Sequence, residues 1–273
     1  MLDIFFCLWY TIIVARERRQ TPLIDRKELI EMVIDRRKHY GIMLDTETAN
    51  TIVEEDGRLC MNYVLPYDVG FAVIDSKGNI YQMFSFVNED IFLKEFKLMQ
   101  SAYYAEKIPL YIKDLVEGRR KLATTYEIRK ALFDMIELYD CDFICAHNAR
   151  FDVIACNNAQ RWTTKSKYRY FFPPWVEIWD TLRMAQDVIC KMPTYINFCK
   201  TNGFMTKHAT PRPQATAEVI YRFITGNTEF AESHTGLEDV QIEVEILKYC
   251  VRQHKPMRKV LYEKKFEKGE IIK

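Results

Sequence analysis

Residues 42–47 read Ile-Met-Leu-Asp-Thr-Glu, an apolar run that ends in two carboxylates. Three consecutive apolar residues after a glycine are typical of a short buried strand. Because side chains alternate along an extended backbone, Asp45 and Glu47 are expected to point to the same side of its end. Two negative charges repel each other unless a cation lies between them, and carboxylate oxygens are ligands that suit Mg²⁺ or Mn²⁺. The stretch therefore predicts either a metal site at a strand end or a solvated pair of acids in a loop.

Outward from this stretch, short apolar runs alternate with helical patterns. Strands are expected at 42–44, 69–75, 80–87, 142–146 and 175–179, with 69–87 forming a hairpin. Helices are expected at 25–40, 124–139, 148–161, 180–190, 194–202, 214–225 and 237–252, and irregular helix at 91–117. This alternation predicts one α/β domain built around a mixed sheet that helices flank.

The chain divides into three predicted parts. Residues 1–40 form an N-terminal appendage and helix, 41–253 the α/β domain, and 254–273 a basic C-terminal tail. The apolar run 4–15 is 12 residues long, whereas a membrane-spanning helix needs about 20. We expect a packed appendage there, with a membrane-surface anchor as the alternative.

The overall composition limits the class of protein. Hydrophobic residues make up 48% and charged residues 28%, which excludes disordered and low-complexity chains. The net charge of +1 predicts that any surface for nucleic acid is local. The eight cysteines form no C-x-x-C and the five histidines no H-E-x-x-H, which removes the usual zinc patterns. Cysteines in apolar runs, such as Cys145, indicate a reducing compartment, so we expect a cytoplasmic protein. Because the apolar run 4–15 is too short to span a bilayer, we expect no membrane partner.

A second candidate motif covers residues 146–152, Ala-His-Asn-Ala-Arg-Phe-Asp, where a strand ends and a helix begins. Asn148 would cap the helix, Phe151 would anchor it in the core, and an acid such as Asp152 favours a helix N-terminus. Each residue thus has a structural explanation. Asn-x-x-Phe-Asp is nevertheless expected only about 0.04 times by chance in a chain of this composition, so it carries more weight than Asp-x-Glu.

A third motif covers residues 233–239, Ser-His-Thr-Gly-Leu-Glu-Asp, at the entry of the final helix. His234 lies five residues before Asp239, but His147 and Asp152 have the same spacing, and a histidine at a helix entry is often structural. His147 ends a core strand, where we expect it to pack. The order of acids along the chain, followed by a histidine that can act as a base, is what favours His234.

In these contexts, Asp-x-Glu, Asn-x-x-Phe-Asp and His-x4-Asp resemble the three motifs of the DnaQ-like 3′–5′ exonucleases, the DEDD superfamily in its histidine subclass (DEDDh). Residues 67–73, Tyr-Asp-Val-Gly-Phe-Ala-Val, are also similar to the family's second strand. The resemblance covers about residues 41–250 and looks most like stand-alone bacterial or bacteriophage enzymes. Segments 49–66 and 163–175 look longer than in compact members, which leaves the choice of substrate open.

The resemblance implies a ribonuclease H-like fold and hydrolysis of DNA from its 3′ end, at single-stranded or frayed ends, with release of nucleoside 5′-monophosphates. It implies a site in which four acids hold two Mg²⁺ or Mn²⁺ ions: Asp45, Glu47, Asp152 and Asp239. His234 would take a proton from the attacking water, and Thr48, Asn148 and Phe151 would contact the terminal nucleotide. This arrangement matches the chemistry, because paired metals activate the water and neutralise the leaving oxygen.

Two other functions remain open at this stage. An RNA-trimming enzyme could use the same site, since discrimination depends on contacts at the 2′ position. A catalytically silent nucleic-acid-binding module is a different class, but it should lose ligands that are all present here. A proofreading role would need a separate polymerase partner, which the sequence does not reveal.

Residues 153–176 contain no acid, and their Lys and Arg residues alternate with aromatic ones. Phosphates pair with such cations and bases stack on such rings, so the segment could form part of a groove for a single strand. The alternative is that the aromatic rings are core and the charges merely solvated.

Overall fold

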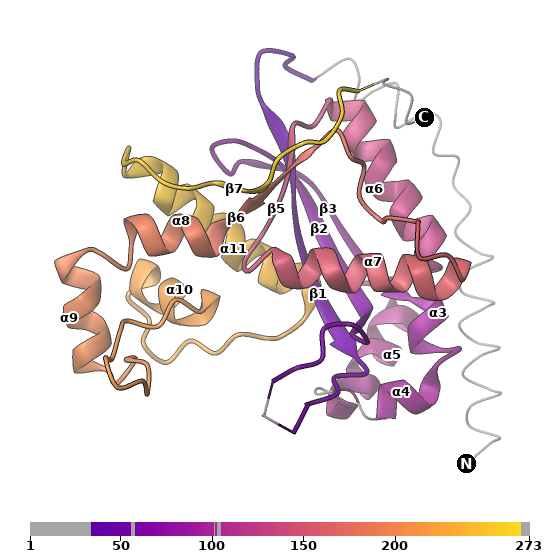
Figure 1. Cartoon of the computed structure of the whole chain (residues 1–273), viewed down its shortest axis with the longest axis horizontal. Helices are drawn as coiled ribbons and strands as arrows, with labels where there is room; N and C mark the ends of the chain where they lie inside the picture. Colours follow the sequence, from indigo (N-terminus) through magenta and orange to yellow (C-terminus); the bar gives the residue numbers. More distant parts are fainter. Residues whose placement is uncertain (1–33, 56–57, 101, 103–104, 269–273) are drawn as a thin grey trace.

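The apolar run 42–44 belongs to the central strand of a mixed β-sheet (Figure 1). The structure is a computed structural model that describes residues 34–55, 58–100, 102 and 105–268. Within that part of the chain the sheet has seven strands in the order β4-β3-β2-β1-β5-β6-β7. Their bounds are β1 Tyr40–Ala49, β2 Leu65–Asp75, β3 Ile80–Asn88, β4 Lys121–Ala123, β5 Phe143–Ala146, β6 Glu177–Asp180 and β7 Val260–Tyr262. β1 pairs antiparallel with β2 and parallel with β5, which confirms the predicted mixed α/β sheet.

Helices cover both faces of this sheet. They are α3 Glu89–Phe92, α4 Phe96–Gln100, α5 Ile108–Glu117, α6 Thr125–Tyr139, α7 Arg150–Thr164, α8 Thr181–Val188, α9 Pro193–Thr201, α10 Ala217–Thr225 and α11 Gly236–Arg252, with a 3₁₀ turn at Ala105–Lys107. Figure 1 shows α8, α9 and α10 together on the left and α3 to α5 at the lower right. No helix in the described ranges is long and apolar enough to span a membrane.

Alternation along β1 assigns each side chain to one of two cores. Ile42 and Leu44 pack into a core with residues of α6 and α7, whereas Met43 packs into a core with residues of α8, α10 and α11. Asp45 therefore lies on the α11 face of the sheet, two residues beyond Met43. This sidedness places the first motif opposite the helix that carries the third.

Several expected elements are present and others differ. The hairpin at 69–87 is confirmed as β2 and β3, and Thr124 forms a complete capping box with Glu127 at the start of α6. The acids of the first motif lie inside a strand and not after it, because β1 continues to pair with β2 as far as Ala49.

The predicted helix at 25–40 is wrong where it can be compared. Residues 25–33 lie outside the described part of the chain, 34–39 form a turn, and Tyr40 begins β1. Tyr40 belongs to the core, where its ring meets those of Tyr81 and Tyr139 edge to face at centroid distances of 5.1 and 5.2 Å. Burial of this ring in a strand outweighs the local helical pattern.

Asn148 does not cap a helix as expected. Its φ is 66°, in the left-handed region that asparagine tolerates, and Ala149 occupies the cap position of α7. At the other end of the chain, part of the segment 254–273 forms β7, which pairs with β6 at the sheet edge.

Candidate functional site

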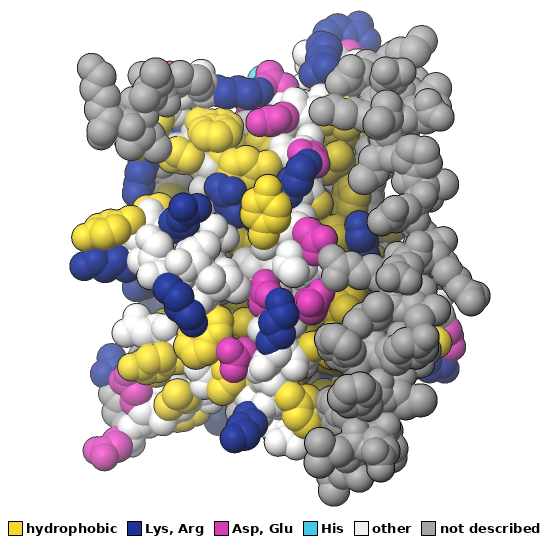
Figure 2. Space-filling model, turned by 90° about the vertical axis from the view of Figure 1, so that its right-hand side faces the viewer, with side chains coloured by type: hydrophobic (Ala, Val, Ile, Leu, Met, Phe, Trp, Pro, Cys, Tyr) yellow, Lys and Arg dark blue, Asp and Glu magenta, His cyan; other side chains and the backbone are white. Residues whose placement is uncertain are grey.

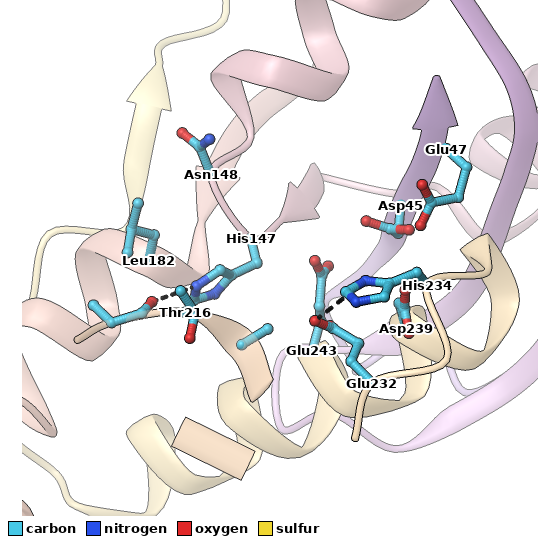
Figure 3. Close-up of a pocket in the computed structure, with 12 residues that line it drawn as sticks. Asp45, Glu47, His147, Asn148, Leu182, Thr216, Glu232, His234, Asp239 and Glu243 are labelled. Atoms are coloured by element: carbon cyan, nitrogen blue, oxygen red, sulfur yellow. Dashed lines mark hydrogen bonds and ion pairs between the residues drawn. The ribbon is translucent and has the colours of Figure 1, made fainter. Parts of the chain in front are cut away.

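A cavity of about 440 Å³ opens where β1 faces the start of α11 (Figure 3). It contains five of the residues that the sequence singled out, namely Asp45, Glu47, Asn148, His234 and Asp239. The other residues that line it are His147, Leu182, Ala215, Thr216, Ala217, Glu232 and Glu243. The first and third motifs, almost 190 positions apart in the sequence, thus meet in one place.

β1 presents Asp45 and Glu47 to this cavity from the same side, as their spacing predicts. The pairing of β1 with β2 is irregular directly after Glu47. Glu47 pairs with Asp68, but the next residue, Thr48, pairs with Pro66, so one residue of β2 is skipped. Such irregularities redirect side chains and are frequent next to functional sites.

Two glycines let α11 approach the sheet closely. A Cβ atom on Gly70 of β2 would lie 2.2 Å from the carbonyl carbon of Gly236, the first residue of α11. A Cβ atom on Gly236 would lie 2.7 Å from the backbone nitrogen of Gly70. Only glycine fits at both positions, and the contact brings the first turn of α11 against β1 and β2.

A buried ionic network holds this end of α11. Asp68 Oδ2 accepts hydrogen bonds from the backbone N–H of Gly236 at 2.9 Å and from the hydroxyl of Tyr111 at 2.7 Å. Arg120 donates to the same oxygen at 3.1 Å, and its other nitrogens reach Asp114 and Glu238 at 3.0 Å. Asp68 is fully buried. Among the ion pairs of the described residues, the guanidinium of Arg120 is the only positive charge that compensates it.

Asp239 lies in the first turn of α11 and is 4% exposed. Its Oδ2 accepts the backbone N–H of Thr235 at 3.0 Å, and its Oδ1 accepts from the hydroxyl of Ser233 at 3.4 Å. Burial raises the pKa of Asp239 to about 8, and the charge of Glu232 adds to the rise. The local loop thus orients this carboxylate without neutralising it.

His234 shares the cavity with two of the acids. One ligand atom each of Glu47, His234 and Asp239 lie within 4.8 Å of one another. The φ of His234 is 50°, and Lys107 binds the carbonyl oxygens of Ser233 and His234 at 2.6 and 3.1 Å. Burial lowers the pKa of His234, and the Lys107 charge lowers it further. The imidazole is therefore neutral at neutral pH and able to accept a proton.

His147 also lines the cavity, but both of its ring nitrogens have partners. Nε2 donates to the carbonyl of Ala215 at 2.7 Å, and Nδ1 lies 3.0 Å from the hydroxyl of Thr181. Burial lowers the pKa of His147. The structural role expected for His147 agrees with these contacts, and it distinguishes the two histidines that have the same spacing to an acid.

The second motif reaches the site only in part. Asp152 is buried in α7, where its Oδ1 accepts a 2.8 Å hydrogen bond from Thr46, the residue between the two acids of β1. Asp152 does not line the cavity, although its charge raises the pKa of Asp45. Its own pKa is raised to about 7 by burial.

The three residues expected to contact a nucleotide differ in position. Asn148 is exposed at the cavity, with its backbone N–H bonded to Asp180 at 3.1 Å. Thr48 and Phe151 are not among the cavity residues, and Phe151 is half-buried and not one of the described core residues. The expectation that Phe151 anchors α7 in the core is wrong, because α7 packs through Ala155, Cys156 and Ala159 instead.

The cavity concentrates acidic side chains. Burial raises the pKa of Glu47 to about 8, with the charges of Asp239 and Asp68 adding to it. Burial also raises the pKa of Asp45 well above its usual range, and the charge of Glu243 is the next largest cause. Asp45 Oδ2 and Glu243 Oε2 are buried oxygens without a hydrogen-bond partner. Orphaned carboxylate oxygens facing one cavity fit divalent cations, which prefer such ligands.

Sequence reasoning missed two acids at this site. Glu243 follows Asp239 by four residues on α11, so helical periodicity alone would have placed both on one face. Glu232 precedes His234 by two residues, and its Oε2 lies 3.8 Å from the histidine Nδ1. Glu218 of α10 completes a second group with Glu232 and His234, a contact between distant segments that no local pattern signals.

The aromatic and basic segment begins inside α7, which contains its residues 153–164, and continues beyond the end of that helix. Tyr168 and Tyr170 are exposed, whereas Phe171 and Phe172 are buried, so the segment is partly core. Arg161 lies over the ring of Tyr170 and Lys167 over that of Tyr168. Figure 2 shows this side of the molecule, where the described basic and acidic side chains are mixed with hydrophobic ones.

Comparison with known proteins gives a fold but no family. No model of a known protein family matches the sequence, and no curated protein matches it significantly. Among solved structures, E. coli exonuclease I in complex with a 5cy-dT13 oligonucleotide is similar with a TM-score of 0.50 and 13% identity, over 80% of this chain and 41% of that chain. A moderately thermophilic exonuclease I from Methylocaldum szegediense has a TM-score of 0.49 and 14% identity over 80% of this chain and 41% of that one.

The chain thus spans about two fifths of the length of these structures. At 13% identity, the similarity to E. coli exonuclease I shows the fold alone. It supports the ribonuclease H-like fold class, a mixed sheet flanked by helices, that the sequence predicts.

Proposed function

We propose that this protein is a metal-dependent 3′–5′ exonuclease of the DEDDh type that hydrolyses DNA to nucleoside 5′-monophosphates. The observation that carries the proposal is the convergence of Glu47, His234 and Asp239 within 4.8 Å in a cavity that Asp45 also lines. The exonuclease I fold supports it, since the solved relative was bound to an oligonucleotide. The catalytic unit in this proposal is residues 41–253.

The acids of this site would hold the cations. Asp45, Glu47 and Asp239 face the cavity, and Asp152 approaches through its contact with Thr46. Two Mg²⁺ or Mn²⁺ ions, when bound, lower the pKa of a water and neutralise the charge that develops on the leaving 3′ oxygen. The protein contributes the carboxylates already clustered for this purpose, at the cost of their mutual repulsion in the metal-free state.

His234 would act as general base. Its neutral imidazole lies beside Glu47 and Asp239, and Lys107 fixes the backbone that carries it. A base near the operating pH that lies next to the attacking water removes its proton efficiently. Asn148, which is exposed and lines the cavity, would contact the terminal nucleotide, and we assign the same role to the buried Thr48 and the half-buried Phe151, which do not line it.

A gel assay with 5′-labelled substrates tests this function. Single-stranded DNA, duplex DNA and single-stranded RNA are each incubated with Mg²⁺, Mn²⁺ or EDTA. We expect a ladder that shortens from the 3′ end of single-stranded DNA in either metal and no cleavage in EDTA. Equal cleavage of a circular single strand, or full activity in EDTA, would contradict the proposal, and faster cleavage of RNA would reassign the substrate.

A further inference from the structure

Glu243 is a buried carboxylate that lines the cavity, and no pattern in the sequence assigned it a role. It lies one helical turn beyond Asp239 on α11 and is 3% exposed. Figure 3 shows its carboxylate directed into the cavity, toward Asp45. Its Oε2 has no hydrogen-bond partner, and neither has Asp45 Oδ2.

The surroundings of Glu243 do not compensate its charge. The backbone N–H of His147 donates one hydrogen bond to the carboxylate. The charged groups that act on it most strongly are Asp152, Asp239 and Glu232, all of them acids. Among the described residues, no Lys, Arg or His forms an ion pair with it.

A carboxylate in this position is unfavourable unless a cation balances its charge. α11 packs through apolar residues on either side, Ile242 and Val244, so an apolar residue would otherwise be compatible with this depth in the fold. Two orphaned oxygens from different elements, one on β1 and one on α11, face the same cavity. The shared explanation is a positive charge between them.

We propose that Glu243 is a fifth carboxylate of the metal site and that it binds a divalent cation together with Asp45. The inference rests on the proposed function, in which the cavity holds metal. Glu243 would supply its ligand from α11 and Asp45 would supply its ligand from β1.

Metal binding without DNA tests this assignment, because it separates the ligand from the chemistry. Mn²⁺ affinity is measured by calorimetry at pH 7.5 for wild type, Glu243→Gln, Glu243→Asp and Glu245→Gln. Glu245 lies on the same helix but pairs with Lys248 at 2.6 Å outside the cavity, so it is the matched control. We expect Glu243→Gln to lose at least about 10-fold in affinity and Glu245→Gln to bind as wild type does.

The relative Mn²⁺ affinities of the two Glu243 variants show whether Glu243 is a ligand or a packing residue. A ligand needs the charge, so Glu243→Asp should bind Mn²⁺ more tightly than Glu243→Gln. A packing residue needs the shape, so the isosteric glutamine would be tolerated better than the shorter aspartate. In addition, the metal-free Glu243→Gln protein should melt at or above the temperature of wild type, because one repelling charge is removed.

Two results would overturn the inference, and they differ in whether the proposed function survives. If wild type binds Mn²⁺ and degrades DNA while Glu243→Gln binds within about twofold of wild type, Glu243 is no ligand and the proposed function stands. If wild type itself binds no Mn²⁺, the metal-dependent function and the role of Glu243 both fail.

Discussion

Gly70 of β2 and Gly236 of α11 meet backbone to backbone, so that a Cβ atom on Gly70 would lie 2.2 Å from the carbonyl carbon of Gly236. This contact sets the distance between β1, which carries Asp45 and Glu47, and α11, which carries Asp239. The cavity depends on it, because the site is assembled from these two elements.

Gly70→Ala should therefore separate α11 from the sheet. We expect a loss of about 1–3 kcal/mol in the free energy of unfolding, as for other overpacked cores, together with weaker Mn²⁺ binding. Urea unfolding and calorimetry measure the two effects. Gly203→Ala is the control, because its φ of 77° is strained for alanine but nothing lies within 4 Å of the new Cβ atom. It should lower stability and leave metal affinity intact; equal metal affinity in both variants would contradict the role of the Gly70 contact.

The buried network at Arg120 predicts a large difference between two neighbouring arginines. Both contact Asp114, but the side chain of Arg120 is 3% exposed and that of Arg119 is 52% exposed. Arg120→Met leaves Asp68 buried without its cation and should cost about 3–5 kcal/mol. Arg119→Met should cost less than about 1 kcal/mol, as exposed ion pairs do. Similar urea midpoints for the two variants would show that the network does not hold α11.

The stability of the metal-free protein should fall as pH rises. The pKa values of Glu47 and Asp239 are raised to about 8 and that of Asp152 to about 7, so the folded state keeps protons that the unfolded state releases near pH 4. Their contribution is complete below about pH 4, is lost as pH rises from there to the folded-state pKa values of about 7 to 8, at up to about 1.4 kcal/mol per pH unit and proton, and does not change further above them. The pKa values of His147 and His234 are lowered, so the unfolded state binds protons more readily at these residues. Their contribution therefore lowers stability as pH falls, but only below about pH 6.5.

Thermal melts between pH 6.5 and 8, where the folded acids lose their protons, measure this effect. We expect the melting temperature to fall without metal and to fall much less in saturating Mg²⁺, which replaces the protons. Glu47→Gln should reduce the slope in the metal-free protein. A melting temperature that stays constant or rises over this range would show that the carboxylates are not clustered as the structure has them.

Replacement of His234 should slow the chemistry and spare binding. A lost general base typically costs about 10²- to 10⁴-fold in rate, so His234→Ala should show this drop in kcat with unchanged affinity for DNA and Mn²⁺. The acid limb of its pH profile, set by a pKa lowered by burial, should disappear. His147→Ala is the control, since its ring nitrogens are engaged by Thr181 and Ala215. If His147→Ala lost the limb and His234→Ala kept it, the third motif would be misassigned.

Local patterns predicted those parts of the site that depend on local geometry. The common orientation of Asp45 and Glu47 follows from strand alternation, and the position of Asp239 on α11 follows from helical periodicity. The choice between His147 and His234 does not follow from spacing, because both precede an acid by five residues. The order of the acids along the chain favoured His234, and the hydrogen bonds that occupy both ring nitrogens of His147 agree with that choice.

Contacts between distant segments explain what the sequence did not predict. Residues 34–40 have a helical pattern, but Tyr40 is held in β1 by rings that lie 41 and 99 positions later. Asp152 lies close enough to Asp45 for its charge to raise the pKa of that acid further after burial, but it is hydrogen-bonded to Thr46 and is not among the residues that line the cavity. Glu243 was overlooked although its spacing from Asp239 was visible, because only the tertiary structure shows that its oxygen is buried without a partner.

The central claim is that metal ions held by the β1 acids drive shortening of DNA from its 3′ end. The most direct measurement is a time course on 5′-labelled single-stranded DNA with Mg²⁺ for wild type and Asp45→Asn, with both proteins shown to be folded by their thermal melts. We predict progressive 3′ shortening by wild type and none by Asp45→Asn, whose metal-free melting temperature should equal or exceed that of wild type because a repelling charge is removed. Shortening by a folded Asp45→Asn protein at the wild-type rate would contradict the account.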